Sequence, residues 1–325
     1  MIESQTPLNE SIIRRFAFLN QKGCLAHAYL FIGPEGIGKK ETALAIAKSV
    51  NCENRKDKKE SFFCDRCSAC QRINLGSHPD VHCIEAQNEG VIKIEQIREL
   101  LDQVKLRPFE ADKKIFIIQN VEFFTLEGAN ALLKTLEEPT QSSLLLLTTS
   151  VPERILDTVK SRCHTIYFVP FSQRSLMRRL SEFYKEDDLQ SHFLAYFSEG
   201  CLGKAKKLKE NKMFQWKNKI IDEFISSEVN EHFIKEILID KDTTRKFLDI
   251  LLSWVRDCLL IKAGVDDHHL VHRDRLHDLN RFHKRYFFNE LLDLSDEIVR
   301  MFKFLSDNLN VKIPLLLISE RLWAR

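Results

Sequence analysis

Residues 33–39 of this chain read Gly-Pro-Glu-Gly-Ile-Gly-Lys and match G-x-x-x-x-G-K, the pattern of a phosphate-binding loop. An apolar run at residues 28–32 precedes this pattern, and a helical pattern follows it, as the motif requires. Gly33, Gly36 and Gly38 let backbone N–H groups surround phosphate oxygens, and the following helix N-terminus adds partial positive charge. With this strand and helix around it, an incidental glycine-rich turn is a poor explanation. The feature predicts an α/β fold with the scaffold of a P-loop ATPase.

The first half of the chain alternates short apolar runs with helical patterns. The strand-like runs lie at residues 28–32, 81–84, 115–118, 143–149 and 165–169. The helix expected over residues 126–136 stops at Pro139, because proline lacks the backbone N–H that a helix needs. Continuous apolar strands separated by helices predict a parallel sheet with helices on both faces.

After Pro170 the strand signal fades, and helical patterns continue to the C-terminus. We therefore expect three domains: a P-loop domain at residues 1–169, a small helical lid domain at residues 170–209, and an all-α domain at residues 210–325. The lid domain ends in a basic run at residues 204–209, which is more often a hydrated helix face than a DNA contact.

The groups that normally hold Mg²⁺ and orient water are absent from the predicted site. The residue after Lys39 is usually Ser or Thr, whose hydroxyl binds Mg²⁺, and here it is Lys40. A later buried strand ends in Gln119 and Asn120, where an acidic pair is expected. Amides cannot act as a general base, and they bind Mg²⁺ more weakly than carboxylates do. Glu122 lies beyond the strand end, so we do not expect this chain to hydrolyse ATP.

Nucleotide binding is a separate question from hydrolysis. Lys39 and the three glycines could hold ATP or ADP without magnesium, and Lys40 could instead fill part of the phosphate site with its own charge. The residues leave both readings open.

Four cysteines cluster in a polar, lysine-rich insertion at about residues 51–72. They are Cys52, Cys64, Cys67 and Cys70. Their two C-x₂-C spacings let thiolates converge on one tetrahedral ion, and four sulfurs suit structural zinc. His78, His82 and Cys83 are spare ligands nearby that rank below Cys52 as the fourth, and free cysteines in a loop are the alternative to a metal site. A site with four protein ligands has no open position, so the ion would be structural.

Composition excludes some classes of protein. The net charge of +2 does not indicate a nucleic-acid binder by itself, so any DNA contact would come from a local patch or a partner. No apolar segment is long enough to span a bilayer, and nothing at the N-terminus resembles a secretory signal. Nine cysteines without an export signal argue against a disulfide framework, and we expect a cytoplasmic protein.

Several stretches in this order resemble the AAA+ clamp-loader subunits of bacterial DNA polymerase III. Besides the phosphate loop and the four-cysteine insertion, they are residues 26–31 (Ala-His-Ala-Tyr-Leu-Phe), 78–80 (His-Pro-Asp), 130–139 (Asn-Ala-Leu-Leu-Lys-Thr-Leu-Glu-Glu-Pro) and 161–163 (Ser-Arg-Cys). The last two are highly specific together. The resemblance is strong over about residues 20–170 and beyond that rests mainly on length and helical character.

The resemblance implies roles for particular residues. The Ser-Arg-Cys motif implies that Arg162 is an arginine finger, which reaches the ATP of a neighbouring subunit; on sequence alone a surface ion pair would be the simpler reading. Thr148 and Thr149 fall where the family has its first sensor. Gly203 stands where hydrolysing members have a second sensor arginine. The family includes a subunit that keeps its finger and lacks a working site.

We therefore expect a non-hydrolysing clamp-loader subunit that joins gamma/tau-type and delta-type subunits through its C-terminal domain. The complex would load the sliding clamp on primed DNA during replication, as part of the DNA polymerase III holoenzyme. Two alternatives are a working ATPase that uses Lys39 and Glu122, and a zinc-stabilised DNA-binding adaptor. The His-rich stretch at residues 268–283 favours a solvated helix face over a metal site.

Overall fold

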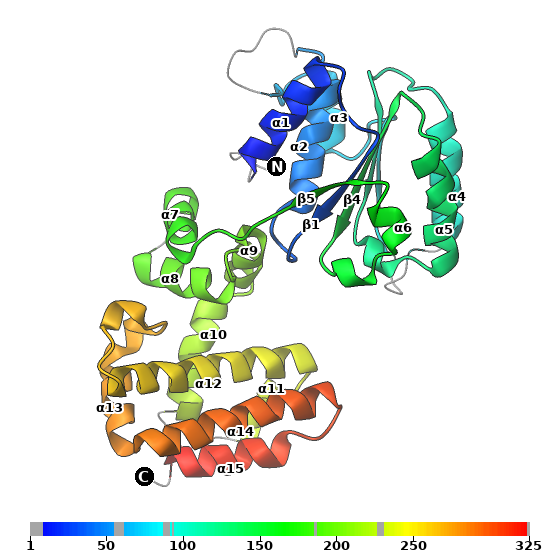
Figure 1. The fold of residues 1–325 in the computed structure, drawn as a ribbon. Helices are drawn as coiled ribbons and strands as arrows, with labels where there is room; N and C mark the ends of the chain where they lie inside the picture. Colours follow the sequence, from blue (N-terminus) through cyan, green and yellow to red (C-terminus); the bar gives the residue numbers. More distant parts are fainter. Residues whose placement is uncertain are drawn as a thin grey trace. The chain divides into compact units, whose positions relative to one another are not determined.

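The computed structural model describes residues 9–54, 62–86, 92, 94–184, 187–225 and 231–323. The chain divides into two compact units (Figure 1). Unit 1 consists of residues 1–170 and 201–204, and unit 2 consists of residues 171–200 and 205–325. The predicted division into three domains, at residues 169 and 209, stays a prediction.

Unit 1 is built on a five-stranded sheet with the strand order β2-β3-β4-β1-β5, in which every pairing is parallel. The strands are β1 (Ala28–Ile32), β2 (Val81–Ile84), β3 (Lys114–Ile118), β4 (Ser143–Thr149) and β5 (His164–Tyr167). Because all five run in one direction, the residues that follow them meet at one edge of the sheet, the carboxyl edge. The phosphate loop, Gln119 and Ser150 all lie at that edge.

Successive side chains of each strand point to opposite faces of the sheet. Because both faces are buried, the strand sequences are apolar throughout. In β1, Tyr29 and Phe31 join one buried cluster, and Ala28 and Leu30 join another. The same alternation holds for β3 and β4, so each face of the sheet has its own core. The predicted parallel sheet with helices on both faces is confirmed.

Helices α1 (Glu10–Gln21), α2 (Lys39–Asn51) and α3 (Ser68–Asn74) cover one face of the sheet (Figure 1). Helices α4 (Ile94–Lys105), α5 (Leu126–Glu137) and α6 (Asp157–Lys160) cover the other. Two short 3₁₀ helices, η2 (Val121–Phe123) and η3 (Pro152–Arg154), follow β3 and β4 at the carboxyl edge.

Among its described residues, unit 2 contains helices joined by short loops and no strand, as predicted. Its first part contains α7 (Gln173–Tyr184), α8 (Asp188–Phe197) and most of α9 (Leu202–Glu210). The helices that follow are α10 (Met213–Ile220), the π-helix η4 (Ile221–Ile225), α11 (Glu231–Ile237) and α12 (Lys241–Lys262). The short 3₁₀ helices η5 (Asp267–His269), η6 (Arg273–Arg275) and η7 (His283–Arg285) surround α13 (Leu276–Phe282).

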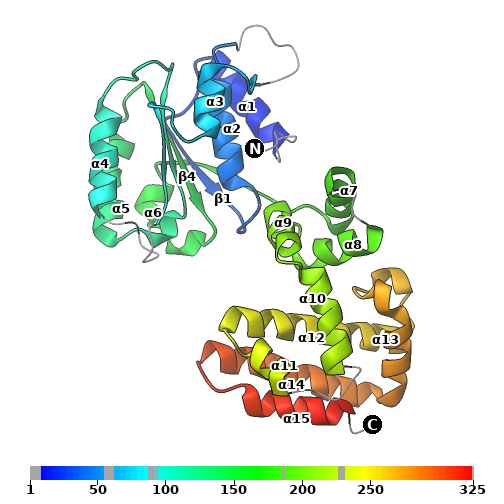
Figure 2. The same ribbon diagram turned by 180° about the vertical axis from the view of Figure 1, so that it is seen from behind.

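Helices α12, α14 (Phe288–Ser306) and α15 (Lys312–Trp323) lie side by side in both ribbon views (Figure 2). Trp254 and Phe247 of α12 and Ile298 of α14 are completely buried. In the described part of the chain, no helix combines the length and apolarity needed to cross a membrane.

Candidate functional site

The phosphate loop joins β1 to α2 as the sequence predicts, and Lys39 is the first residue of the helix. Gly36 and Gly38 have positive φ angles of 75° and 96°, which other residues rarely adopt. The Lys39 side chain folds back onto the loop, and its Nζ donates hydrogen bonds to the carbonyl oxygens of Gly33 at 2.5 Å and Pro34 at 3.0 Å. Burial lowers the pKa of Lys39 below its usual value, although Glu122 opposes this shift. Lys39 is therefore satisfied by the backbone of its own loop.

Lys40 points away from the loop. Its Nζ lies 3.2 Å from Oε2 of Glu85, and the same oxygen accepts a hydrogen bond of 2.8 Å from Nε2 of Gln119. Gln119, at the end of β3, thus bonds to Glu85 rather than facing the loop. Thr42 offers no replacement hydroxyl for Mg²⁺, because its Oγ1 donates to the carbonyl of Gly38 at 2.7 Å. Sequence reasoning did not identify Glu85, which carries no motif.

Glu122 is held by the end of the neighbouring strand. Its Oε1 accepts hydrogen bonds from the backbone N–H of Ser150 at 3.0 Å and from the Ser150 hydroxyl at 2.7 Å. Burial alone would raise the pKa of Glu122, but these hydrogen bonds outweigh it and the pKa lies below its usual value. Its other oxygen, Oε2, is buried without a hydrogen-bond partner among the described residues. Asn120 donates its backbone N–H to Oγ1 of Thr148, so this sensor-position threonine braces η2.

Residues 201–204 pack directly against the outside of the phosphate loop. The backbone N–H of Gly203 donates to the carbonyl of Gly36 at 2.9 Å. A Cβ atom on Gly203 would lie 2.8 Å from that oxygen, and a Cβ on Gly36 would lie 2.8 Å from the backbone N of Lys204. Glycine is thus required on both sides of the contact. A side chain at position 203 is incompatible with this packing.

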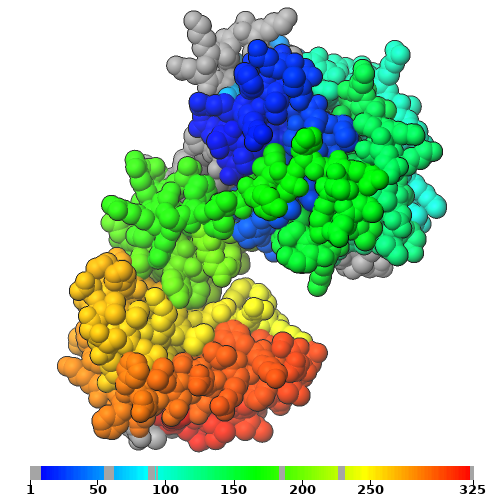
Figure 3. Space-filling model, in the orientation of Figure 1, coloured from blue at the N-terminus to red at the C-terminus, as the bar shows by residue number. Residues whose placement is uncertain are grey.

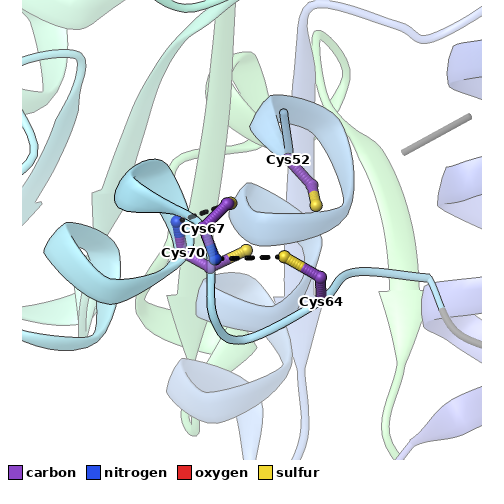
Figure 4. A group of neighbouring side chains, drawn as sticks. All are labelled: Cys52, Cys64, Cys67 and Cys70. Atoms are coloured by element: carbon purple, nitrogen blue, oxygen red, sulfur yellow. Dashed lines mark hydrogen bonds between the residues drawn. The ribbon is translucent and has the colours of Figure 1, made fainter. Parts of the chain in front are cut away.

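The four cysteines come together as the sequence predicts. Cys52 follows the last residue of α2, Cys64 and Cys67 precede α3, and Cys70 lies in the first turn of α3 (Figure 4). Their sulfur atoms all lie within 4.8 Å of one another. A Zn–S bond of about 2.3 Å would place the sulfurs of a tetrahedral site about 3.8 Å apart. The group could therefore hold a metal ion after a small contraction.

Hydrogen bonds to sulfur support the same conclusion. The backbone N–H of Cys67 donates to Sγ of Cys64 at 3.2 Å, and that of Cys70 donates to Sγ of Cys67 at 3.4 Å (Figure 4). Burial alone would raise the pKa of Cys64, but such backbone hydrogen bonds lower it to about 6. Burial raises the pKa of Cys52 and Cys70, and a bound dication would offset that effect by favouring the thiolates.

Arg162 lies at the surface just after α6. Its Nη2 forms an ion pair of 2.7 Å with Oε1 of Glu137, and its Nη1 donates to the carbonyl of Thr158 at 2.9 Å. About a third of the Arg162 side chain is exposed, at 34%. Glu137 belongs to the stretch at residues 130–139, so the two most specific parts of the sequence meet in space.

The His-Pro-Asp stretch has a structural explanation. The carboxylate of Asp80 is completely buried and accepts three backbone N–H groups, from Phe109, Glu110 and Ala111, at 2.7–3.0 Å. Burial alone would raise the pKa of Asp80, but these donors hold it below its usual value. The aspartate therefore fixes the loop before β3 and has no catalytic arrangement around it.

Sequence reasoning did not resolve an exposed apolar row in unit 2. Phe288, Leu292 and Val299 of α14 are exposed, and their spacing of four and seven residues places them on one face of the helix. Ile313 and Leu317, one turn apart on α15, are exposed as well. We call these five residues the α14–α15 apolar face. Exposed apolar side chains in regular helical rows make these residues a candidate interaction surface.

Comparison with known proteins gives the family. A family model described as "DNA polymerase III, delta subunit" matches residues 8–172, and a second, described as the C-terminal part of that subunit, matches residues 212–322. DNA polymerase III subunit delta' of Bacillus subtilis is 34% identical over 266 residues, which cover 78% of this chain and 78% of that protein. The chain belongs to the delta-prime family of DNA polymerase III subunits.

Other relatives fall inside the same group of proteins. The delta-prime subunit of Pseudomonas aeruginosa is 38% identical over 139 residues, which are 42% of each chain. The tau subunit of Bacillus subtilis is 38% identical over 175 residues, which are 54% of this chain and only 30% of tau. The likeness to the Bacillus subtilis delta-prime subunit extends over most of the chain, whereas the likeness to the tau subunit of the same organism covers about half of it.

Proposed function

We propose that this chain is the non-hydrolysing, delta-prime-type subunit of a clamp loader, which acts in DNA replication by loading the sliding clamp on primed DNA. It supplies Arg162 in trans to the ATP site of a neighbouring gamma/tau-type subunit. The observation that carries the proposal is a phosphate loop whose charged groups are bonded within the chain, combined with an arginine held at the surface by a single carboxylate.

The state of the chain's own site supports the first half of the proposal. Lys40 pairs with Glu85, and Gln119 bonds to the same carboxylate, so neither position can supply an Mg²⁺ ligand. Gly203 lies against the loop in place of a sensor arginine. Hydrolysis needs a metal ligand, a group that orients water and charge on the γ-phosphate, and this site has lost parts of all three.

The position of Arg162 supports the second half. An exposed ion pair such as that with Glu137 contributes about 0–1 kcal/mol, so phosphate oxygens of a neighbour could replace the carboxylate at little cost. Glu137 keeps the guanidinium near the surface in the free chain. Glu137 therefore holds Arg162 only until a neighbour's phosphate replaces it.

The α14–α15 apolar face supports assembly through unit 2. Its side chains are exposed in the free chain, and burying each would contribute on the order of 1–3 kcal/mol. Its surroundings on α14 carry both acidic and basic residues, as the rim of an interface does. We propose that this face contacts the other clamp-loader subunits.

Zinc fits the cysteine cluster best, because four thiolates with N–H···S hydrogen bonds match a closed structural site. Cys52 directly follows α2, and the other three ligands lie just before α3 or in its first turn, so an ion here would fix the insertion against the helix that begins at the phosphate loop. Its role would be to stabilise unit 1.

The test uses the complex reconstituted with gamma/tau-type and delta-type subunits, clamp and primed DNA. A trans arginine is worth about 10³–10⁵ in rate at the site it serves, so Arg162→Ala should remove that site's share of DNA-stimulated ATPase and lower clamp loading. Arg154→Ala, at an exposed arginine of η3, is the matched control and should leave both rates unchanged. Glu137→Gln should retain activity, because it frees Arg162. Undiminished ATPase with Arg162→Ala contradicts the proposed role.

A further inference from the structure

One face of α7 carries a row of basic and polar side chains that no motif accounts for. Arg174, Met177, Arg178 and Ser181 are spaced by three, four and seven residues from the first, so they lie on the same side of the helix. All four line one pocket of about 290 Å³. The pocket lies within unit 2, remote in sequence from the phosphate loop.

Two other segments complete the walls of this pocket. The first turn of α8 contributes Asp188 and Leu189, and η6 contributes Arg273. In the space-filling view, the green residues of α7 and α8 adjoin the gold residues that include η6 (Figure 3). We call this the arginine pocket.

The charges of the arginine pocket do not balance. Three guanidinium groups line it, but among the described residues Asp188 is its only carboxylate, and that group lies 3.5 Å from the Ser181 hydroxyl. Arg178 forms an ion pair with Glu182 at 2.8 Å. Because 82% of the Arg178 side chain is exposed, this pair is weak. Arg174 forms no ion pair with any residue that the structure describes. The pocket thus has an excess of positive charge.

Arg273 provides an independent sign that a ligand is missing. Its Nη2 donates to the carbonyl of His268, but its Nε is buried without a hydrogen-bond acceptor among the described residues. A buried charged donor with no acceptor costs free energy, and natural proteins rarely tolerate one without a reason. Because that atom is closed off from solvent, an anion in the pocket reaches it only when the Arg273 side chain rotates.

We propose that the arginine pocket binds a phosphate group. A phosphate has several acceptor oxygens and up to two negative charges, so it can bond to two or three guanidinium forks at once, whereas one carboxylate serves one fork well. Met177 and Leu189 add apolar surface for the group attached to the phosphate. The phosphate can come from a free nucleotide or from the backbone of a nucleic acid, and this proposal does not depend on the role of Arg162.

The first experiment titrates the full chain with pyrophosphate by calorimetry at constant ionic strength. A hydrogen bond to a charged group is worth enough that Arg174→Gln/Arg178→Gln should weaken binding at least about tenfold. Arg273→Gln is a second, single variant that should weaken binding as well. Lys39→Ala excludes the phosphate loop as the binding site, and Arg245→Gln, at an exposed arginine of α12, controls for net charge. Arg245→Gln should bind as the unmodified chain does, Lys39→Ala should retain the binding that depends on the pocket arginines, and melting curves check folding.

A second titration uses a short, labelled single-stranded oligothymidylate. Binding that needs the pocket arginines supports the proposal with a nucleic-acid phosphate as the source, even if pyrophosphate does not bind. The proposal is overturned if neither probe binds, if binding is unchanged in the arginine variants, or if Lys39→Ala abolishes it. Binding of a polyglutamate peptide alone, with the same arginine dependence, would also overturn it and would assign the pocket to an acidic protein segment.

Discussion

Two places in this molecule have the residues that bind phosphate, and they differ in how those residues are used. In the phosphate loop, Lys39 bonds to its own backbone and Lys40 to Glu85. In the arginine pocket, three guanidinium groups and one carboxylate lie among the described lining residues, and Nε of Arg273 lacks an acceptor there. A sequence motif therefore identifies the type of loop. Which ligand the site can bind depends on the hydrogen-bond donors that its side chains do not use within the chain.

The largest expected difference between the two phosphate-type sites comes from removing metal from the cysteine cluster. Helix α2 carries Lys39 at its start and leads to Cys52 at its end, so loss of the ion should loosen unit 1, including the phosphate loop. We expect chelation or Cys70→Ser to destabilise unit 1 by several kcal/mol, with no change at the arginine pocket. Hydrogen–deuterium exchange, read separately for the two units, measures this.

The matched control for that experiment is Cys24→Ser, at an exposed cysteine outside the cluster, which should behave as the unmodified chain. A preparation without metal that keeps full protection in unit 1 would rule out a structural ion.

The second largest effect is expected from Gly203→Ala. Helix propensity alone would favour alanine by up to about 1 kcal/mol, but the new Cβ would lie 2.8 Å from the carbonyl oxygen of Gly36. We expect a net loss of about 1–3 kcal/mol and faster exchange of the loop amides. Lys206→Ala, at an exposed position of the same helix, should be close to neutral. A Gly203→Ala protein that melts at a higher temperature would show that the loop has room to move.

Acid should affect unit 2 through His272, which precedes Arg273 and is completely buried against the Ser253 hydroxyl. Burial lowers the pKa of His272 well below its usual value, and the nearby Lys217, Arg256 and Arg275 lower it further. The unfolded chain then binds a proton below about pH 6.5 while the folded chain does not, so stability falls as the pH drops.

Between pH 6.5 and 5.5 this histidine should contribute a loss of roughly 1 kcal/mol. Denaturant melts of His272→Gln should show a correspondingly smaller pH dependence, whatever its stability at neutral pH. His269→Gln, at an exposed histidine of η5, should keep the full dependence. Equal pH slopes in all three proteins would mean that His272 is not the titrating group.

The smallest effect is expected from Lys40→Thr, which restores the hydroxyl of the phosphate motif. The pair of Lys40 with Glu85 is exposed on both sides, so its loss should cost less than about 1 kcal/mol. Because Gln119 and Asn120 remain, we expect no Mg²⁺-dependent ATPase from the isolated chain. Turnover that disappears on Lys39→Ala or Glu122→Gln would instead support a working ATPase, with the unpaired Oε2 of Glu122 as its base.

Sequence predicted the parts of this molecule that depend on local pattern. Strands that are buried on both faces have continuous apolar sequences, and the cysteine spacing was enough to predict that the four sulfurs lie together. It did not predict the partners that side chains find across the fold. Glu85 meets Lys40 and Ser150 meets Glu122 only because of the sheet order, and Gly203 reaches the phosphate loop only because the chain returns to unit 1. The arginine pocket was missed for the same reason, since Arg273 lies far along the chain from α7.

The ion pair between Arg162 and Glu137 has a consequence for the kinetics of assembly. With a carboxylate 2.7 Å away, the guanidinium projects little net field beyond the Debye length of about 8 Å at physiological salt. Arg162 would therefore contribute little to attracting a partner from a distance, and its charge would be felt only after contact, when Glu137 is exchanged for the partner's phosphate. Arg162→Ala should leave the association rate and its salt dependence nearly unchanged, while the rate of ATP turnover in the assembled complex falls.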